Sequence, residues 1–383
     1  MKKIFIIARE MESGGTEVSL INLLNELVKN KDVSITLGLL RKKGMYLKDI
    51  PDQVEVKEIL NKKQLWCLEP MQTKDFKLGE LFSAFLFKLF IKLFRRKKLE
   101  KYKEILKGIK EQKAIYDIAI DYHGYGFIGT CYVIDKIKAK KKITFVHDEK
   151  IDWMAKVEPY IAKYDKIYCV SEACKQRVLE RYPKYEEKLD IFRNIINKGK
   201  IIKLSKDKIS EMNEDCPKLL TVGRLEYQKG YDLLLDVAEI LMKNNHEFKW
   251  YIIGNGSLYQ SIKKEIEERK LLDKVILLGV KKNPYPYFAK CDIYIQTSRH
   301  EGYGIAIAEA RILEKPIIST DLSCIREQIK NGENGLLCNF DKIEFYNTIK
   351  DLMADKKLRE KLIENLKKDN KESSNDIKKL LEV

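Results

Sequence analysis

The chain has 383 residues, of which 44% are hydrophobic, and a formal net charge of +16. This length exceeds what one ordinary core accommodates, so we expect two globular domains of roughly 150–200 residues each. The eight cysteines are scattered without a Cys-x-x-Cys pair, which is typical of reduced core residues in a cytoplasmic protein. The apolar run before Arg9 has only five residues, Ile4 to Ala8, which is too short for a signal peptide and long enough for a buried strand.

The positive charge is unevenly distributed. Between Lys88 and Lys113 there are eleven Lys or Arg and three Glu, a local excess of +8 within the total of +16. This imbalance predicts a basic patch that faces an anionic surface. RNA is the competing anionic partner, but we find no aromatic-basic motif of the recognised nucleic-acid-binding kinds, and we expect no nucleic acid partner.

Short apolar segments alternate with longer helical stretches along the chain, the pattern of parallel sheets covered by helices. The expected strands are 3–8, 34–40, 54–59, 117–122, 142–146 and 166–170 in a first series, and 218–223, 250–253, 275–278, 292–297, 316–319 and 335–337 in a second. A polar, glycine-containing stretch at 194–200 separates the series. We therefore expect two doubly wound domains, 1–197 and 198–355, with a ligand cleft at the carboxyl ends of both sheets, followed by helices over 356–383.

A glycine pair follows the first strand, in Ser13-Gly14-Gly15-Thr16-Glu17, and precedes a helix. Glycines between a strand and a helix let the backbone approach a phosphate closely. The fingerprint Gly-x-Gly-x-x-Gly is missing, which disfavours an NAD site. By itself the pair is equally consistent with an ordinary tight turn.

The segment from Leu78 to Lys98 combines apolar and basic residues. The seventeen residues 78–94 include three charged positions, which makes a membrane span unfavourable. If this segment is a helix, one narrow polar stripe runs along it through residues spaced four apart: Glu80, Ala84, Lys88, Lys92 and Arg96. This pattern indicates an amphipathic helix in the interface of an anionic membrane, with the stripe toward the headgroups. The alternative is a helix buried between the sheet and its neighbour.

Histidine 147 ends a strand beside Asp148, where it can face the cleft and hydrogen-bond a sugar or its phosphate; a structural cap is the alternative. Of the other histidines, His123 and His246 are remote in sequence, and only His300, next to Glu301, has an expected cleft position. No two aspartates are two residues apart, so the Asp-x-Asp pattern that holds a metal–diphosphate is missing. We expect no metal cofactor.

Two cationic residues follow the expected strand 218–223, in Gly223-Arg224-Leu-Glu-Tyr-Gln-Lys229-Gly230. Arg224 and Lys229 lie five apart across a turn at a strand's carboxyl end, so both can point into one cleft and bind a pyrophosphate. Solvated surface charges are the alternative interpretation.

The run from Ser298 to Ala310 is the most informative in the chain. It follows a strand, turns on Gly302 and Gly304, and continues as a helix that places Glu301 in the turn and Glu309 about two turns along. The open amides of a helix start suit a phosphate, and a carboxylate suits ribose hydroxyls. The pattern predicts a nucleoside diphosphate site, against the alternative of a surface turn with two unrelated glutamates.

Together these motifs resemble the retaining family-4 glycosyltransferases of the two-Rossmann-domain (GT-B) type. The matching pieces are Gly14-Gly15-Thr16-Glu17, His147, Gly223-Arg224 with Lys229-Gly230, Gly254-Asn-Gly256 and Glu301-x7-Glu309, in order across almost the whole chain. The stretch 279–292 is similar to the branch that builds bacterial capsular polysaccharide, lipopolysaccharide, exopolysaccharide or lipid-linked glycans. The resemblance also implies that the C-terminal helices of residues 356–383 cross back and pack on the first domain.

The resemblance implies a role for each matching residue. Arg224 and Lys229 would neutralise the diphosphate, Glu309 would hold the ribose, and His147 and Glu301 would lie near the donor sugar. The remaining expected contacts to the nucleotide sugar are Gly14, Gly15, Gly256, Gly302, Tyr303, Gly304 and Ile305. The catalytic set would be His147, Glu301, Arg224 and Lys229.

The resemblance predicts a metal-independent retaining transferase that moves a sugar from a nucleoside-diphosphate donor, UDP-linked in our expectation, to a lipid-linked or other glycan acceptor. With the basic helix, it predicts a cytoplasmic protein on the inner face of the cell membrane. Two other functions are compatible with the sequence: a non-catalytic sugar-nucleotide-binding subunit of a glycan-assembly complex, and a soluble sugar phosphorylase on the same fold.

Overall fold

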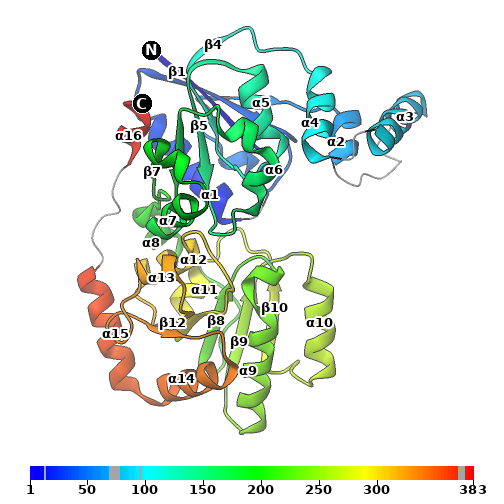
Figure 1. The fold of residues 1–383 in the computed structure, drawn as a ribbon. Coiled ribbons are helices and arrows are strands. Elements are labelled where there is room, and N and C mark those ends of the chain that lie inside the picture. Colours follow the sequence, from blue (N-terminus) through cyan, green and yellow to red (C-terminus); the bar gives the residue numbers. More distant parts are fainter. Residues whose placement is uncertain (13, 69–77, 95–96, 370–375) are drawn as a thin grey trace.

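The computed structural model describes residues 1–12, 14–68, 78–94, 97–369 and 376–383. The predicted positions Ser13 and Arg96, and residues 370–375 of the predicted C-terminal helices, lie outside these ranges. The chain forms two α/β domains, one above the other in Figure 1, and helices cover both faces of each parallel sheet. The two-Rossmann-domain fold class expected from the sequence is confirmed.

The N-terminal sheet has seven strands in the order β3-β2-β1-β4-β5-β6-β7, with every neighbouring pair parallel. Its strands are β1 (Lys2–Ala8), β2 (Val33–Leu39), β3 (Val54–Glu58), β4 (Ile115–Asp121), β5 (Lys138–Val146), β6 (Lys166–Cys169) and β7 (Leu189–Ile191). The short β7 was not predicted. The helices of this part are α1 (Gly15–Leu27), η1 (Leu47–Asp49), α2 (Lys62–Leu68), α3 (Leu78–Phe94), α4 (Lys98–Lys107), α5 (Ile128–Lys136), α6 (Asp152–Ile161), α7 (Glu172–Arg181) and η3 (Pro183–Lys188).

The C-terminal sheet has six parallel strands in the order β10-β9-β8-β11-β12-β13. They are β8 (Lys218–Val222), β9 (Lys249–Ile253), β10 (Val275–Gly279), β11 (Ile293–Gln296), β12 (Ile317–Thr320) and β13 (Leu336–Cys338). The helices are α8 (Lys198–Leu204), η4 (Tyr227–Lys229), α9 (Tyr231–Lys243), α10 (Tyr259–Glu268), α11 (Tyr285–Lys290), α12 (Ile305–Ile312), α13 (Ser323–Arg326), α14 (Lys342–Ala354), α15 (Lys356–Asp369) and α16 (Ile377–Leu381).

Strand β1 illustrates why these segments form sheets with two covered faces. Its side chains alternate, so Ile4 and Ile6 pack in one core with α1 while Phe5 and Ile7 pack in another with α5 and α6. Both faces are therefore apolar, and the strand is a continuous hydrophobic run. In both sheets the strand order reverses beside the first strand, β1 or β8. The carboxyl ends at these two reversal points define the region where a ligand binds in folds of this kind.

The C-terminal helices divide between the two domains (Figure 1). Leu362 of α15 is buried in the core of the C-terminal sheet. Ile377 and Leu380 of α16 are buried instead with residues of β1 and α1, and the Tyr168 hydroxyl donates to the Lys379 carbonyl at 3.2 Å. Of the described residues in 356–383, those of α16 pack on the N-terminal domain, whereas α15 packs in the core of the C-terminal sheet. This corrects the expectation that both helices do so.

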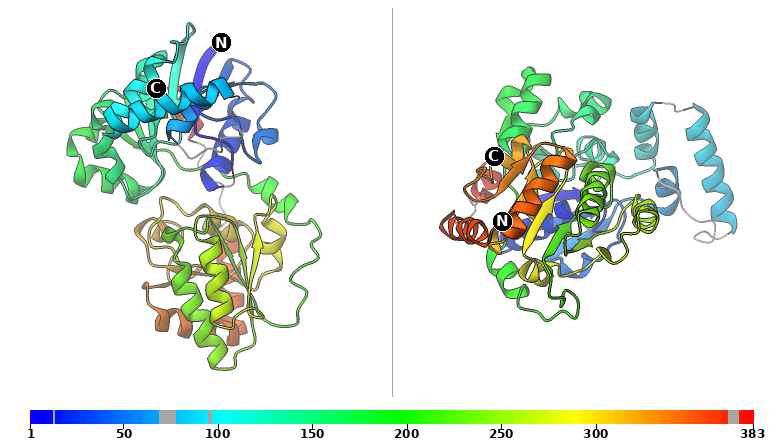
Figure 2. Two further views of the ribbon diagram at one scale, coloured as in Figure 1. Left: turned by 90° about the vertical axis from the view of Figure 1, so that its right-hand side faces the viewer. Right: turned by 90° about the horizontal axis from the view of Figure 1, so that it is seen from below.

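Helix α3 lies at the outer side of the N-terminal domain against α2 (Figures 1 and 2). Ala84 is buried, and the Lys88 ammonium lies 4.6 Å from the centre of the Trp66 ring, so the predicted polar stripe turns toward the protein at these two residues. The outward face is apolar and consists of Phe82, Phe85, Leu86, Leu89, Phe90 and Leu93. Ala84 and Lys88 therefore do not face outward, whereas Lys92 is exposed. The alternative of a helix buried in the core is incorrect, and the placement of α3 at a membrane stays a prediction. Within the described ranges, no helix has the length and apolar content needed to cross a bilayer.

Candidate active site

A cavity of about 780 Å³ lies between the domains, at the carboxyl ends of both sheets. The N-terminal domain contributes the loop after β1, the start of α1 and the residues that follow β4 and β5. The C-terminal domain contributes the loops after β8, β9 and β10 and the turn before α12. The size is suited to a small molecule of nucleotide-sugar dimensions, since ligand pockets typically span about 300–1,000 Å³.

The predicted site residues meet at this cavity with one exception. Its lining includes Gly14, Gly15, His147, Arg224, Lys229, Glu301, Gly302, Tyr303, Gly304, Ile305 and Glu309. Gly256 is not among the lining residues, although Gly254 and Asn255 are. A Cβ atom at Gly256 would lie 2.3 Å from the Leu225 carbonyl oxygen, so this glycine is needed for backbone packing, and its prediction as a binding residue is corrected.

Two helix N-termini face each other across the cavity. Helix α1 begins at Gly15 and α12 begins at Ile305, and a Cβ atom on Gly15 would lie 3.0 Å from the Ile305 Cδ1 atom. Gly304, before α12, has a φ of +80°, a conformation that favours glycine. The unpaired amides and the partial positive charge of a helix N-terminus attract anions, and here both domains direct one toward the same space.

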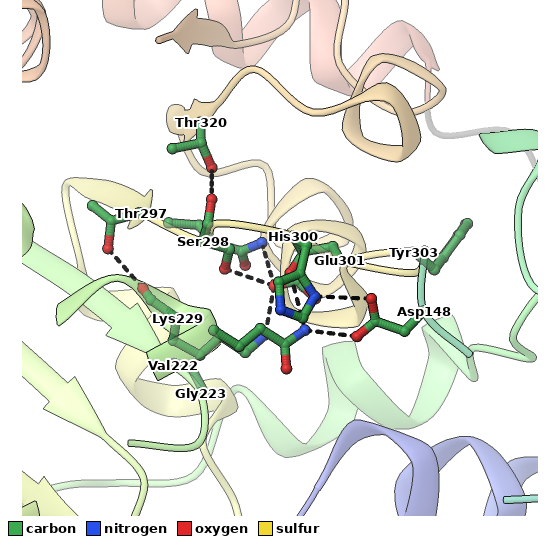
Figure 3. Close-up of polar contacts among 12 residues, drawn as sticks. Asp148, Val222, Gly223, Lys229, Thr297, Ser298, His300, Glu301, Tyr303 and Thr320 are labelled. Atoms are coloured by element: carbon green, nitrogen blue, oxygen red, sulfur yellow. Dashed lines mark hydrogen bonds and ion pairs between the residues drawn. The ribbon is translucent and has the colours of Figure 1, made fainter. Parts of the chain in front are cut away.

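Lys229 and Glu301 form an ion pair at the cavity wall (Figure 3). The Lys229 Nζ atom lies 2.5 Å from Glu301 Oε1, which also accepts hydrogen bonds from Ser298 Oγ at 2.7 Å and Gln296 Nε2 at 3.1 Å. Glu301 is only 6% exposed. The lysine is therefore held in one position by a buried carboxylate, a pairing that the sequence did not predict.

Arg224 is an exposed cation on the cavity wall. Its guanidinium makes no hydrogen bond or ion pair with any residue that the structure describes. Across the cavity, Glu17 Oε1 lies 3.3 Å from His123 Nε2. Burial opposes ionisation of Glu17, but the hydrogen bond and charge of His123, with the charge of Arg224, hold its pKa below the usual value. Glu17 thus provides a carboxylate opposite the arginine.

Glu309 is buried in α12, 7% exposed, and accepts a hydrogen bond from the Tyr285 hydroxyl at 3.0 Å. Burial raises its pKa to about 7. Tyr46 also lines the cavity, and burial together with the charge of Glu309 raises its pKa to about 12. A carboxyl group with such a pKa ionises more readily when hydroxyl groups donate to it.

His147 follows β5 and is buried between aromatic rings, with the Phe145 ring centre at 5.7 Å and the Tyr125 ring centre at 6.3 Å. Its Nε2 atom lies 2.6 Å from the Tyr122 carbonyl oxygen. A carbonyl only accepts, so Nε2 carries the hydrogen and Nδ1 presents a lone pair. Burial lowers the pKa of His147 to about 4, which keeps the ring neutral near pH 7.

Polar contacts join the domains beside the cavity (Figure 3). The two oxygens of Asp148 bind His300 Nδ1 at 2.9 Å and Gln228 Nε2 at 3.1 Å. His300 therefore lies at the domain interface and is not among the residues that line the cavity. His123, which was not predicted as a site residue, does line it. No group of three or more His, Cys, Asp or Glu in the described ranges is arranged to hold a metal ion.

The fold and the cavity define a two-domain α/β protein with a cleft that is suited to an anionic ligand. Residues 203–369, most of the C-terminal domain, match the family model for glycosyl transferases, group 1. The match lies in the C-terminal domain and covers less than half of the chain.

Two curated relatives are each 34% identical to this chain. One is a poly(ribitol-phosphate) alpha-N-acetylglucosaminyltransferase of Staphylococcus aureus, matched over 139 residues that cover 36% of this chain and 27% of the relative. The other, from Campylobacter jejuni, is an N-acetylgalactosamine-N,N'-diacetylbacillosaminyl-diphospho-undecaprenol 4-alpha-N-acetylgalactosaminyltransferase, matched over 143 residues that cover 37% of this chain and 38% of the relative. The matches therefore span less than half of either relative's length.

The fold extends over the complete chain in the comparison with solved structures. A variant of TarM from S. aureus, solved with fondaparinux, alpha-GlcNAc-glycerol and UDP, superposes with a TM-score of 0.73. The superposition covers 100% of this chain and 99% of the TarM chain at 17% identity. At this identity the likeness establishes the fold.

Proposed function

We propose that the protein is a retaining glycosyltransferase that moves a sugar from a nucleoside-diphosphate sugar, UDP-linked, to a phosphate-containing or lipid-linked glycan acceptor. The observation that carries this proposal is the cavity itself. It combines two opposed helix N-termini, the cations Arg224 and Lys229, and the buried carboxyl group of Glu309. This arrangement offers donors for a diphosphate and an acceptor for ribose hydroxyls.

The chemistry follows from where charge develops. As the bond between the anomeric carbon and the diphosphate breaks, negative charge accumulates on the leaving phosphate. Fixed cations and helix amides in a cavity stabilise this charge without having to reorganise, which is usually the largest single contribution to catalysis. Lys229, Arg224 and the start of α12 supply these groups, so we propose a reaction that needs no metal. A leaving phosphate oxygen takes the proton of the acceptor hydroxyl on the same face.

His147 and Glu301 have supporting roles in this proposal. The Nδ1 lone pair of neutral His147 accepts a hydrogen bond from a donor-sugar hydroxyl, because Nε2 is occupied by the Tyr122 carbonyl. Glu301 fixes Lys229 through the ion pair. We do not assign Glu301 and Glu309 as an acid/base pair of the glycosidase kind. In that chemistry two carboxyl groups flank one bond, and here Glu301 is paired with a lysine.

The names of the two relatives support a donor that carries an N-acetylhexosamine and an acceptor that contains phosphate. Both names print an N-acetylhexosaminyl transfer with an alpha linkage, and both acceptors contain phosphate, as poly(ribitol-phosphate) or as diphospho-undecaprenol. The TarM structure contains UDP. A retaining reaction would yield an alpha linkage from an alpha-linked donor.

The proposal is tested by UDP release from a panel of UDP-sugars, with and without excess EDTA, and by UDP binding in calorimetry. We expect UDP to bind and one UDP-sugar to be hydrolysed slowly without acceptor, in both cases with EDTA present. UDP binding without transfer or hydrolysis for any acceptor would instead indicate a non-catalytic subunit. Turnover only with inorganic phosphate would indicate a phosphorylase. Absence of nucleotide binding would refute the proposal.

We further propose that α3 docks the protein on the inner face of the cell membrane, from the cytoplasm. Its outward residues Phe82, Phe85 and Leu93 are 67%, 53% and 56% exposed, although the side chains are strongly apolar. They form one stripe with Leu86, Leu89 and Phe90, and the exposed Lys92 lies beside it. An apolar stripe with an adjacent lysine is suited to the interface of a bilayer that contains anionic lipids.

Co-sedimentation with phosphatidylglycerol vesicles tests this docking. We expect the double variant Phe85→Ser/Leu89→Ser to lose most vesicle binding, whereas Leu272→Ser, which removes a 60% exposed leucine from the C-terminal domain, should bind normally. Undiminished, salt-resistant sedimentation of the double variant would refute the proposal. Self-association that the same two substitutions abolish, without vesicle binding, would assign the stripe to a second copy of the chain.

A further inference from the structure

Asp148, which follows β5, joins the N-terminal domain to two residues of the C-terminal domain. Its carboxylate accepts a hydrogen bond from His300 Nδ1 at 2.9 Å and another from Gln228 Nε2 at 3.1 Å (Figure 3). Gln228 also donates to the His300 carbonyl at 2.9 Å, which joins these two residues to each other. Along the chain, Gln228 directly precedes Lys229 and His300 directly precedes Glu301, so the contact adjoins both partners of the ion pair at the cavity wall.

The backbone of the turn that contains His300 is also bonded across the domain interface. The Glu149 N–H donates to the Glu301 carbonyl at 3.4 Å. The Cys174 thiol, in α7, donates to the Gly302 carbonyl at 3.4 Å. Three consecutive residues of the turn therefore hydrogen-bond to the N-terminal domain, and α12, whose N-terminus faces the cavity, begins just beyond them.

A second pair of neighbouring residues links the same turn to α7. Glu327, which follows α13, accepts hydrogen bonds from the backbone N–H groups of Glu172 at 3.2 Å and Ala173 at 2.9 Å. These are the first two residues of α7, where open amides and the helix dipole stabilise a carboxylate. The next residue, Gln328, donates from its side chain to the Tyr303 carbonyl. The position of α7 is thus communicated to the end of the turn through a single step along the chain.

We infer that Asp148 and His300 are positioning residues of the diphosphate site. Their contact across the domain interface fixes the turn that carries Glu301, and the Glu301 carboxylate fixes the Lys229 ammonium. The inference rests on the proposed transferase function and adds residues that act on the donor through another pair of side chains. A contact made by the N-terminal domain thereby orders part of the phosphate site on the C-terminal domain.

The nucleoside part of the donor is held independently of this contact. Glu309, proposed for the ribose, is hydrogen-bonded to Tyr285 within the C-terminal domain. A change at His300 should therefore weaken the binding of UDP, whose second phosphate reaches Lys229 in the proposed site. It should spare UMP, which lacks that phosphate.

Titration calorimetry of the full-length protein with UDP and with UMP tests the inference. His300→Leu removes the Nδ1 donor, and we expect about 10-fold weaker UDP binding, the size of one hydrogen bond to a charged group, with UMP within about 2-fold of the wild-type protein. His300→Asn keeps an N–H near the position of Nδ1 and should restore UDP binding. The matched control is His246→Leu, which removes an imidazole that lies 3.3 Å from the Tyr346 hydroxyl, and should bind both nucleotides normally.

A double-variant cycle assigns the effect to the contact itself. Asp148→Ala should weaken UDP binding at least as much as His300→Leu does, and Asp148→Ala/His300→Leu should bind no more weakly than Asp148→Ala alone. Additive losses would show that the two residues act separately and would overturn the inference.

Three other results would also overturn it: unchanged UDP binding by His300→Leu, equal weakening of UDP and UMP, or failure of His300→Asn to restore UDP binding. Equal weakening would indicate a general loss of structure. Failure of the proposed function gives a different result, because the wild-type protein would then not bind UDP at all.

Discussion

Glu309 has a buried carboxyl group whose only hydrogen-bond donor among the described side chains is Tyr285. Its pKa of about 7, raised by burial, lies above the value of an exposed glutamate. Between about pH 4.5 and 7 the unfolded chain has lost this proton and the folded protein retains it. The folded state then binds more protons, so its stability falls as pH rises through this window.

We predict that Glu309→Gln removes this pH dependence. Between pH 5 and 8 the ligand-free wild-type protein should lose up to about 3 kcal/mol relative to the variant, since each pKa unit corresponds to about 1.4 kcal/mol. Urea unfolding at both pH values measures the difference. Parallel stability curves for the two proteins would contradict the raised pKa.

Lys229→Ala should lower turnover by on the order of 10²-fold or more, as expected when a charge partner of the transition state is lost. Because the substitution also leaves Glu301 without its cation, thermal unfolding is measured alongside. Lys243→Ala, which removes an exposed lysine that pairs with Glu239, is the control and should keep full activity. Near-normal turnover of Lys229→Ala would exclude this residue from the diphosphate site.

Individual side chains were predictable most directly where they follow the end of a strand. His147, Arg224 and Glu301 each follow a strand and line the cavity. The same rule applied to β4 would have found His123. The pairing of Lys229 with Glu301 depends on the positions of two separate loops, which no spacing in the sequence fixes. Gly256 matched a motif, but its physical role is close packing against Leu225.

Helix α16 tests how far a short element can stabilise a domain. Leu380 is fully buried against the N-terminal core, and Ile377 lies beside it. Leu380→Ala should destabilise the N-terminal domain by about 2–5 kcal/mol, the usual cost of deleting a buried leucine side chain. Chemical unfolding monitored by near-UV circular dichroism measures it. The exposed neighbour Lys378→Ala is the control, and equal stability of the two variants would contradict the packing.

Elements with a strong apolar pattern were predicted well. The existence of strand β7 and the orientation of helix α3 were not predicted. Strand β7 is only three residues long, Leu-Asp-Ile, and such a run carries no periodicity. Helix α3 has a clear amphipathic pattern, but the pattern is the same whether the apolar stripe faces a core or faces outward. Its orientation is set by the packing of Ala84 and Lys88 on α2.

The contact between the domains is close at Gly302. A Cβ atom there would lie 1.9 Å from the His147 carbonyl oxygen, a backbone atom that cannot rotate away. We predict that Gly302→Ala separates the domains locally and lowers transfer by at least 10-fold, while UDP still binds to the C-terminal domain. Small-angle scattering and turnover measure the two effects.

The control for this substitution is Gly199→Ala, where the added atom would meet only the Asn197 side chain at 3.7 Å. A Gly302→Ala protein with normal turnover would show that catalysis does not require this contact.

The two-domain architecture was predictable because alternating strand and helix patterns define two parallel sheets. The distance between the sheets was not, since it depends on individual contacts such as that of Gly302 with His147.

The packing of α16 on the N-terminal domain has a consequence for folding during translation. The first sheet is translated within the first half of the chain, yet one of its faces is completed only by residues 377–381. A domain usually folds as a unit while the ribosome continues elongation. Here the nascent N-terminal half exposes an apolar patch on this face until residues 377–381 have left the ribosome.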